Sequence, residues 1–243
     1  MEPATFIGHV RIDGAAVLEA SQRGPSTPVP SCPEWTAADI VGHLGGAYWW
    51  VEAMVRTRAT DVGEFAPRPE EWDALCAWYD EGLSALLVTL EAVGPDEPVW
   101  NWSVMGPGPA RFWHRRVAHE CSIHRWDIEQ ALGISHSIDV DLAADGIEES
   151  LDIAPFWLAL KPCPELTGTL GLLATDADVA TTLTLAPDHL EHHRGVDHPD
   201  AVLRAGASDL LLWLVGRLDA ASDAVVVEGD LDVARAWSAV SFG

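Results

Sequence analysis

The sequence predicts an α+β protein of two domains, with an N-terminal antiparallel four-helix bundle followed by a small α+β domain. Long segments with apolar residues at helical spacing occupy the first two thirds of the 243-residue chain. After Pro164 the pattern changes to short runs of β-forming residues separated by turn residues. We therefore expect the bundle over residues 1–160 and the α+β domain over residues 166–243.

Start and stop signals bound the predicted helices. Thr36, followed three residues later by Asp39, forms a capping-box pattern at the start of the second helix. The third helix stops at Gly94-Pro95 and the fourth at Gly133. The segment VWNWSVMGPGPA between these two helices is expected to be a loop. The predicted helices cover residues 5–22, 38–57, 69–93, 110–132 and, before the KPCPE break, 142–159.

The second domain combines short strands with two helices. Its strand candidates alternate or cluster β-forming residues between Gly, Pro and Asp, whereas SDLLLWLVGRL and DVARAWSAV have a helical pattern. Strands are predicted over residues 168–175, 180–187, 198–206 and 224–230, and helices over residues 208–218 and 232–240.

The charge balance excludes several kinds of partner. The chain has 38 acidic and 14 basic residues, a formal net charge of -24, which repels nucleic acid phosphates and anionic membranes. No apolar run approaches the roughly 20 residues of a membrane span, and MEPATFIGHVRIDG lacks a signal-peptide pattern. A cytoplasmic protein is therefore expected. Its cysteines lack CxxC spacing and should be free thiols: Cys32, Cys76, Cys121 and Cys163.

The stretch AHECSIHRWD, residues 118–127, carries candidate metal ligands on the fourth helix. Successive helical residues turn by about 100°. Measured from Val117, His124 falls near the middle of the apolar stripe and Glu120 at its edge. Asp127 lies just beyond that edge, and His119 points to the opposite face.

The second helix supplies a further histidine. His43 shares an apolar stripe with Ile40 and Met54, and Asp39 lies on the same side. A buried carboxylate is costly unless it is paired or binds a metal. Two imidazoles and a carboxylate suit a divalent ion, zinc first and nickel second. Asp39 or Asp127 would accept the second N–H of a ligating histidine.

Spacing alone leaves a second interpretation open. An inward histidine can be a hydrogen-bonded core residue, and a glutamate at the edge of an apolar stripe can extend to water. Likewise HLEHH, residues 189–193, has the composition of a metal cluster but is expected to be a solvated strand or turn.

VPSCPEWTAADIVGHLGG, residues 29–46, and RRVAHECSIHRWDIEQALG, residues 115–133, resemble the signature segments of the mycothiol-dependent maleylpyruvate isomerase family. DLAADGIEE, DLLLWLVGR and VVVEGD are similar to later parts of the same family. The resemblance implies a DinB-like helical bundle and a sterol-carrier-like second domain. It also implies that His43, Glu120 and His124 bind the metal, and it makes Arg217 the candidate for binding an acidic substrate. An arginine such as Arg217 can equally complement a helix dipole.

The family resemblance further implies mycothiol, the low-molecular-weight thiol of actinobacteria, as cosubstrate. The expected activity is a thiol-dependent reaction of a small electrophile, either cis–trans isomerisation or S-transfer. Two alternatives remain: a hydrolase that uses zinc-bound water on the same ligands, and a non-catalytic protein of the same fold that binds a small molecule.

Overall fold

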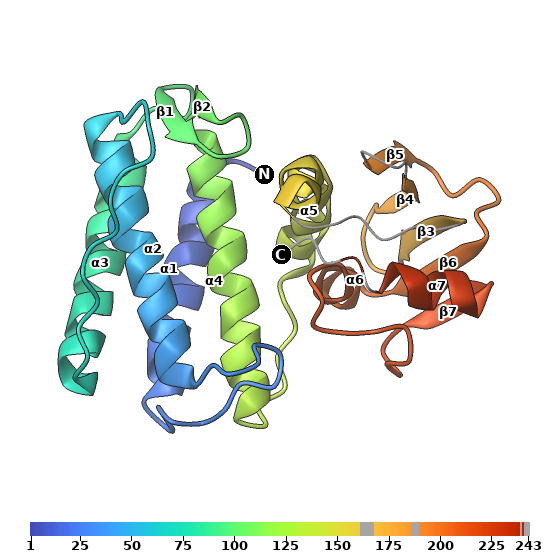
Figure 1. The fold of residues 1–243 in the computed structure, drawn as a ribbon, viewed down its shortest axis with the longest axis horizontal. Helices are drawn as coiled ribbons and strands as arrows, with labels where there is room; N and C mark the ends of the chain where they lie inside the picture. The colour runs from blue at the N-terminus through green and yellow to red at the C-terminus, as the bar shows by residue number, and fades with distance from the viewer. Residues whose placement is uncertain (161–167, 186–189, 239, 241–243) are drawn as a thin grey trace. The chain divides into compact units, whose positions relative to one another are not determined.

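The computed structural model describes residues 1–160, 168–185, 190–238 and 240. The chain divides into two compact units, Met1–His136 and Ser137–Gly243 (Figure 1). The predicted boundary, between residues 160 and 166, lies after this division, and residues 161–167 fall outside the described part. The helix predicted over 142–159 is therefore grouped with the second unit.

The first unit is a bundle of four long helices, as predicted (Figure 1). α1 packs on α3 and α4, and α2 packs on α3 and α4. Val10, Val17, Ile40, Leu44 and Leu86 are fully buried between them. The helices are α1 (Pro3–Ser21), α2 (Ala37–Thr57), α3 (Trp72–Ala92) and α4 (Arg111–Ala131).

Reciprocal glycine–tryptophan packing explains Gly45 inside α2. A Cβ at Gly45 would lie 2.6 Å from the Trp78 ring, and a Cβ at Gly82 would lie 2.8 Å from Nε1 of Trp49. Each helix thus receives an indole of the other against a glycine. The close packing of α2 on α3 offsets the low helix propensity of glycine.

The segment predicted as a loop between the third and fourth helices contains a hairpin instead. β1 (Pro98–Asn101) pairs antiparallel with β2 (Gly106–Pro109). Trp100 links this hairpin to the bundle, because its N–H donates to Ala59 at 2.8 Å and its carbonyl accepts from Nε1 of Trp113 at 2.9 Å. The strand β2 was not predicted because its sequence is Gly-Pro-Gly-Pro, and neither residue type favours strands.

In its described residues, the second unit is a mixed sheet with three helices. The five-stranded sheet has the order β5-β4-β3-β6-β7, in which β3 and β6 are parallel and the other neighbours are antiparallel. Its core includes Leu170, Leu203, Trp213 and Trp237. The strands are β3 (Thr169–Ala174), β4 (Ala180–Leu185), β5 (Leu190–Arg194), β6 (Ala201–Ala205) and β7 (Val226–Gly229). The helices are α5 (Val140–Leu160), α6 (Ala207–Leu214) and α7 (Leu231–Trp237).

This architecture confirms the predicted fold class, including the four predicted strands of the second domain. Cys76 and Cys121 are free thiols, the Cys32 thiol donates a hydrogen bond to Asp127, and Cys163 lies outside the described residues. Among the described helices, none has both the length and the apolar character that a membrane crossing requires.

Candidate metal centre

The structure brings His43 of α2 together with Glu120 and His124 of α4. Oε2 of Glu120 lies 3.6 Å from Nε2 of His43 and 3.5 Å from Nε2 of His124. The two imidazole rings meet edge to face, with centroids 5.0 Å apart. Glu120 and His124 are neighbours because they lie one turn apart on the same helix.

The site lies at the margin of the bundle core. The His124 side chain is 8% exposed and that of Glu120 is 27% exposed, whereas 40% of the His43 side chain is exposed. The prediction that the His43 side chain points into the bundle interior is therefore wrong. The side chain faces α4 but lies near the surface of the bundle. This exposure leaves part of His43 and Glu120 open to solvent.

His119 occupies the other face of α4, as its helical angle predicts. It is buried, and its ring packs edge-on against Phe6 of α1 at 6.0 Å between centroids. α4 is thus enclosed on both faces, so that burial alone does not distinguish a ligand histidine from a packing histidine on this helix.

Asp127 holds His124. Its Oδ2 lies 2.9 Å from Nδ1 of His124, and the carboxylate also accepts hydrogen bonds from Ser31 at 2.6 Å and from the Cys32 thiol at 3.5 Å. The Asp127 side chain is fully buried. A carboxylate at Nδ1 favours the tautomer with the proton on that nitrogen, which leaves the Nε2 lone pair directed at Glu120 and His43.

Asp39, the other predicted partner of a ligating histidine, is engaged elsewhere. Its Oδ2 accepts from the backbone N–H of Thr36 at 2.9 Å and from the Thr36 hydroxyl at 2.7 Å. Its Oδ1 pairs with Arg68 at 3.2 Å. These contacts, led by the Thr36 N–H, lower the pKa of Asp39. Asp39 therefore caps α2 and is not directed at His43.

Arg116 is a residue of the site that the helical angles did not single out. Its guanidinium contacts Oε1 of Glu120 through two donors, Nε at 3.1 Å and the closer Nη2. Burial by itself would raise the pKa of Glu120, but Arg116 and the two histidines outweigh it and hold that pKa well below the usual range. Glu120 is therefore an ionised carboxylate at neutral pH.

Trp35 forms an aromatic wall beside both histidines. Its ring centroid lies 5.1 Å from that of His43 and 6.1 Å from that of His124, nearly parallel to the latter. The residue belongs to the loop before α2, the same loop that supplies Ser31 and Cys32 to Asp127. In the sequence, only its position directly before the Thr36 cap indicated that Trp35 lies near the start of α2.

The residues present fit a divalent metal. The candidate ligand atoms of His43, Glu120 and His124 lie within 4.8 Å of one another, and the donor set of two imidazole nitrogens and a carboxylate oxygen suits zinc. A second group, Cys32 with His124 and Asp127, meets the same distance criterion. In this second group the Asp127 carboxylate already accepts hydrogen bonds from Ser31 and His124. Asp127 therefore orients His124 and is a weaker candidate for a metal ligand than Glu120.

Arg217 lies in the second unit, just after α6. It is half-buried and donates from Nη1 to the carbonyl of Val215 at 2.8 Å. The turn position agrees with the interpretation that Arg217 complements the end of the helix. Its binding of an acidic substrate stays a prediction.

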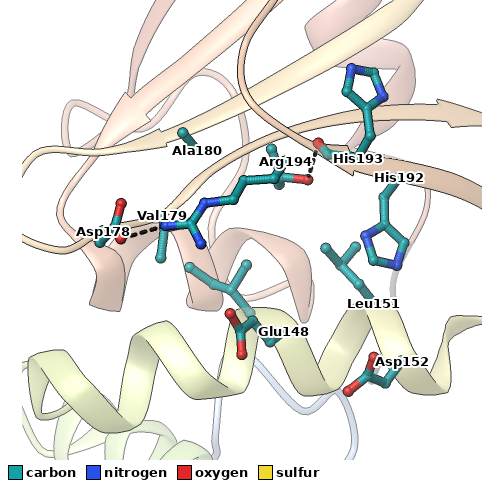
Figure 2. A pocket seen from close by; sticks show the side chains of 11 residues that line it. Glu148, Leu151, Asp152, Asp178, Val179, Ala180, His192, His193 and Arg194 are labelled. Atoms are coloured by element: carbon teal, nitrogen blue, oxygen red, sulfur yellow. Dashed lines mark hydrogen bonds and ion pairs between the residues drawn. The ribbon is translucent and has the colours of Figure 1, made fainter.

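A separate pocket of about 340 Å³ lies within the second unit, between α5 and strands β4 and β5 (Figure 2). Figure 2 shows His192 directed toward α5 and Asp152, and His193 directed to the other side of the strand. Arg194 pairs with Asp178 at the rim. Glu191, His192 and His193 are exposed on β5, as expected of a solvated strand; His189 lies outside the described residues.

Comparisons with known proteins match both units. Residues 9–129 match the family model described as the mycothiol maleylpyruvate isomerase N-terminal domain, and residues 141–236 match the MDMPI C-terminal domain. Two solved structures match, one of the mycothiol-dependent maleylpyruvate isomerase and one of its histidine-to-alanine mutant. Each is 14% identical, has a TM-score of 0.63, and covers 94% of this chain and 93% of its own. At this identity the structural likeness shows the fold alone. No curated protein matches the sequence.

Proposed function

Since this chain belongs to the mycothiol maleylpyruvate isomerase family, to which residues 9–129 and 141–236 both match, we propose that it is a metal- and mycothiol-dependent enzyme acting on a small electrophile. One observation carries the proposal: Nε2 of His43, Nε2 of His124 and Oε2 of Glu120 converge while Asp127 holds the far side of His124. A cytoplasmic location, where thiols stay reduced, belongs to the same proposal.

Each residue has a defined task in this proposal. His43, Glu120 and His124 would hold the metal, with zinc favoured by the donor set and nickel also accepted. A bound divalent metal lowers the pKa of a coordinated thiol, so that the sulfur is nucleophilic at neutral pH. Asp127 fixes the His124 tautomer, and Trp35 shields one side of the two imidazoles from water.

The reaction class follows from the nucleophile. The thiol sulfur adds to one carbon of a cis double bond conjugated to a carbonyl, and the electron pair moves to the carbonyl oxygen. Rotation about the new single bond and loss of the thiol, with return of the electron pair, give the trans isomer. No oxidant or reductant is consumed. If the electrophile is instead an epoxide or an alkyl halide, the thiol stays attached and the enzyme is an S-transferase.

Metal content provides the decisive first test. Wild type, His124→Ala and the exposed control His192→Ala are purified without an affinity tag or chelator, and metal per chain is measured. We expect about one zinc or nickel per chain in wild type and in the control, and its loss in His124→Ala. A wild type that stays metal-free after incubation with zinc, cobalt and nickel would overturn the proposal.

Activity then separates the reaction classes. Metal-loaded protein is supplied with a cis-enone acid, with and without mycothiol. Turnover that requires the thiol supports the proposed function. Cleavage of an added ester or amide without thiol would assign a hydrolase that uses metal-bound water. Stabilisation by ligand without turnover would assign a binding protein.

A further inference from the structure

The two oxygens of Glu120 have different surroundings. Oε1 accepts both donors of Arg116, whereas Oε2 faces Nε2 of His43 and Nε2 of His124. An unrestrained carboxylate can bind a metal through one oxygen or through both. Here the guanidinium already occupies the oxygen that a two-oxygen ligand would need.

The Arg116 contact is built into the helix. Arg116 precedes Glu120 by one turn of α4, and its side chain is only 10% exposed. A guanidinium with two donors on one carboxylate is a directional contact, which a single ammonium does not reproduce. Solvent therefore does not readily displace Arg116 from Oε1.

We propose that Arg116 is a positioning residue that restricts Glu120 to one-oxygen coordination of the metal. This inference rests on the proposed function, since it requires a metal on His43, Glu120 and His124. Three protein donor atoms then remain, two nitrogens and Oε2. A site with three protein ligands keeps a position for an exogenous ligand, here the sulfur of the thiol cosubstrate.

The chain contains a matched control on the same helix. Arg125 pairs with Glu129 at 3.0 Å with the same four-residue spacing, and it also contacts Asp13 at 2.9 Å. Its side chain is 21% exposed, so this pair is similarly sheltered. Glu129 and Asp13 are not among the candidate metal ligands. Removing Arg125 therefore removes an equivalent helix ion pair without touching Glu120.

The test uses the full chain loaded with cobalt(II), whose visible bands weaken as the coordination number rises, and titrated with N-acetylcysteine. In Arg116→Ala we expect about one cobalt per chain, weaker visible bands before thiol is added, and thiol affinity lower by on the order of tenfold. Arg116→Lys keeps the charge without the two-donor contact and should recover part of the affinity. Arg125→Ala should behave as wild type.

The outcomes distinguish the inference from the proposed function. If wild type binds cobalt and thiol, and Arg116→Ala has the same bands and the same thiol affinity, the positioning role is overturned. An Arg125→Ala variant with the same loss would also overturn it, because the effect would then come from helix stability. If Arg116→Ala does not fold, a wild-type spectrum and thiol affinity in Arg116→Lys would overturn the role. A wild type that binds no cobalt removes the proposed function, and this inference with it.

Discussion

Asp127 connects the loop before α2 to a candidate ligand on α4. It accepts hydrogen bonds from Ser31, Cys32 and His124, and its side chain has no exposed surface. A carboxylate beside an imidazole raises the basicity of the metal-facing nitrogen and fixes its orientation. A change at Asp127 should therefore alter metal binding without removing a ligand.

We expect Asp127→Asn to weaken zinc binding by about 10- to 100-fold. The amide keeps the shape of the side chain but lacks the charge, and its oxygen and nitrogen compete for the same three partners. Competition with a chromophoric chelator measures the affinity. Ser31→Ala is the control, since it removes one hydrogen bond to Asp127 and leaves the carboxylate on His124. Equal affinity in Asp127→Asn and wild type would contradict the role.

The sequence identified three side chains that the structure brings together, but not all of the residues around them. His43, Glu120 and His124 follow from helical angles and the family resemblance, because rotation along a helix is fixed by its geometry. Arg116 was missed, since an Arg and a Glu four residues apart usually form a surface pair of little consequence. Only the tertiary packing that buries the Arg116 side chain gives this pair its significance.

Among the elements, long helices were easier to predict than short strands. α2 and α4 have many apolar positions at one period, whereas β1 and β2 have four residues each, two of them proline in β2. Short strands depend on their partners for stability. The grouping of α5 with the second unit was likewise outside the reach of periodicity, which shows that a helix has a buried face but not what covers it.

The capping box of α2 gives a prediction with a defined pH dependence. At pH 7 we expect Asp39→Ala to lower the free energy of unfolding by roughly 1 kcal/mol, as other lost helix caps do. Folding lowers the pKa of Asp39 below its ordinary 3.8, first through the Thr36 N–H. The stabilisation is therefore present above the unfolded pKa and is lost as the pH falls through the lower folded pKa.

Urea unfolding of wild type and Asp39→Ala from pH 7 to pH 2.5 measures this difference. Asp73→Ala is the control, because Asp73 lies in the first turn of α3 but α3 has no side-chain cap. It should cost only a few tenths of a kcal/mol through the helix dipole. A cost of Asp39→Ala that stays constant down to pH 2.5 would show that the carboxylate charge does not contribute.

For the whole molecule, the division into two units determines how metal binding affects stability. All three ligand candidates, with Asp127 and Arg116, lie in Met1–His136. Ser137–Gly243 has a separate core around Leu170, Leu203 and Trp213. A ligand that binds only the folded form of one unit stabilises that unit by mass action.

We expect zinc at 100 times its dissociation constant to stabilise the first unit by about 2.7 kcal/mol. In calorimetry of the full chain, zinc should raise the temperature of the unfolding transition of this unit. The transition temperature of the second unit should not change when zinc is added. His124→Ala removes the binding and should abolish the shift, and His192→Ala in the second unit should leave it intact. An equal upward shift of the transition in His124→Ala would show that the metal binds elsewhere, because that variant lacks one of the three candidate ligands.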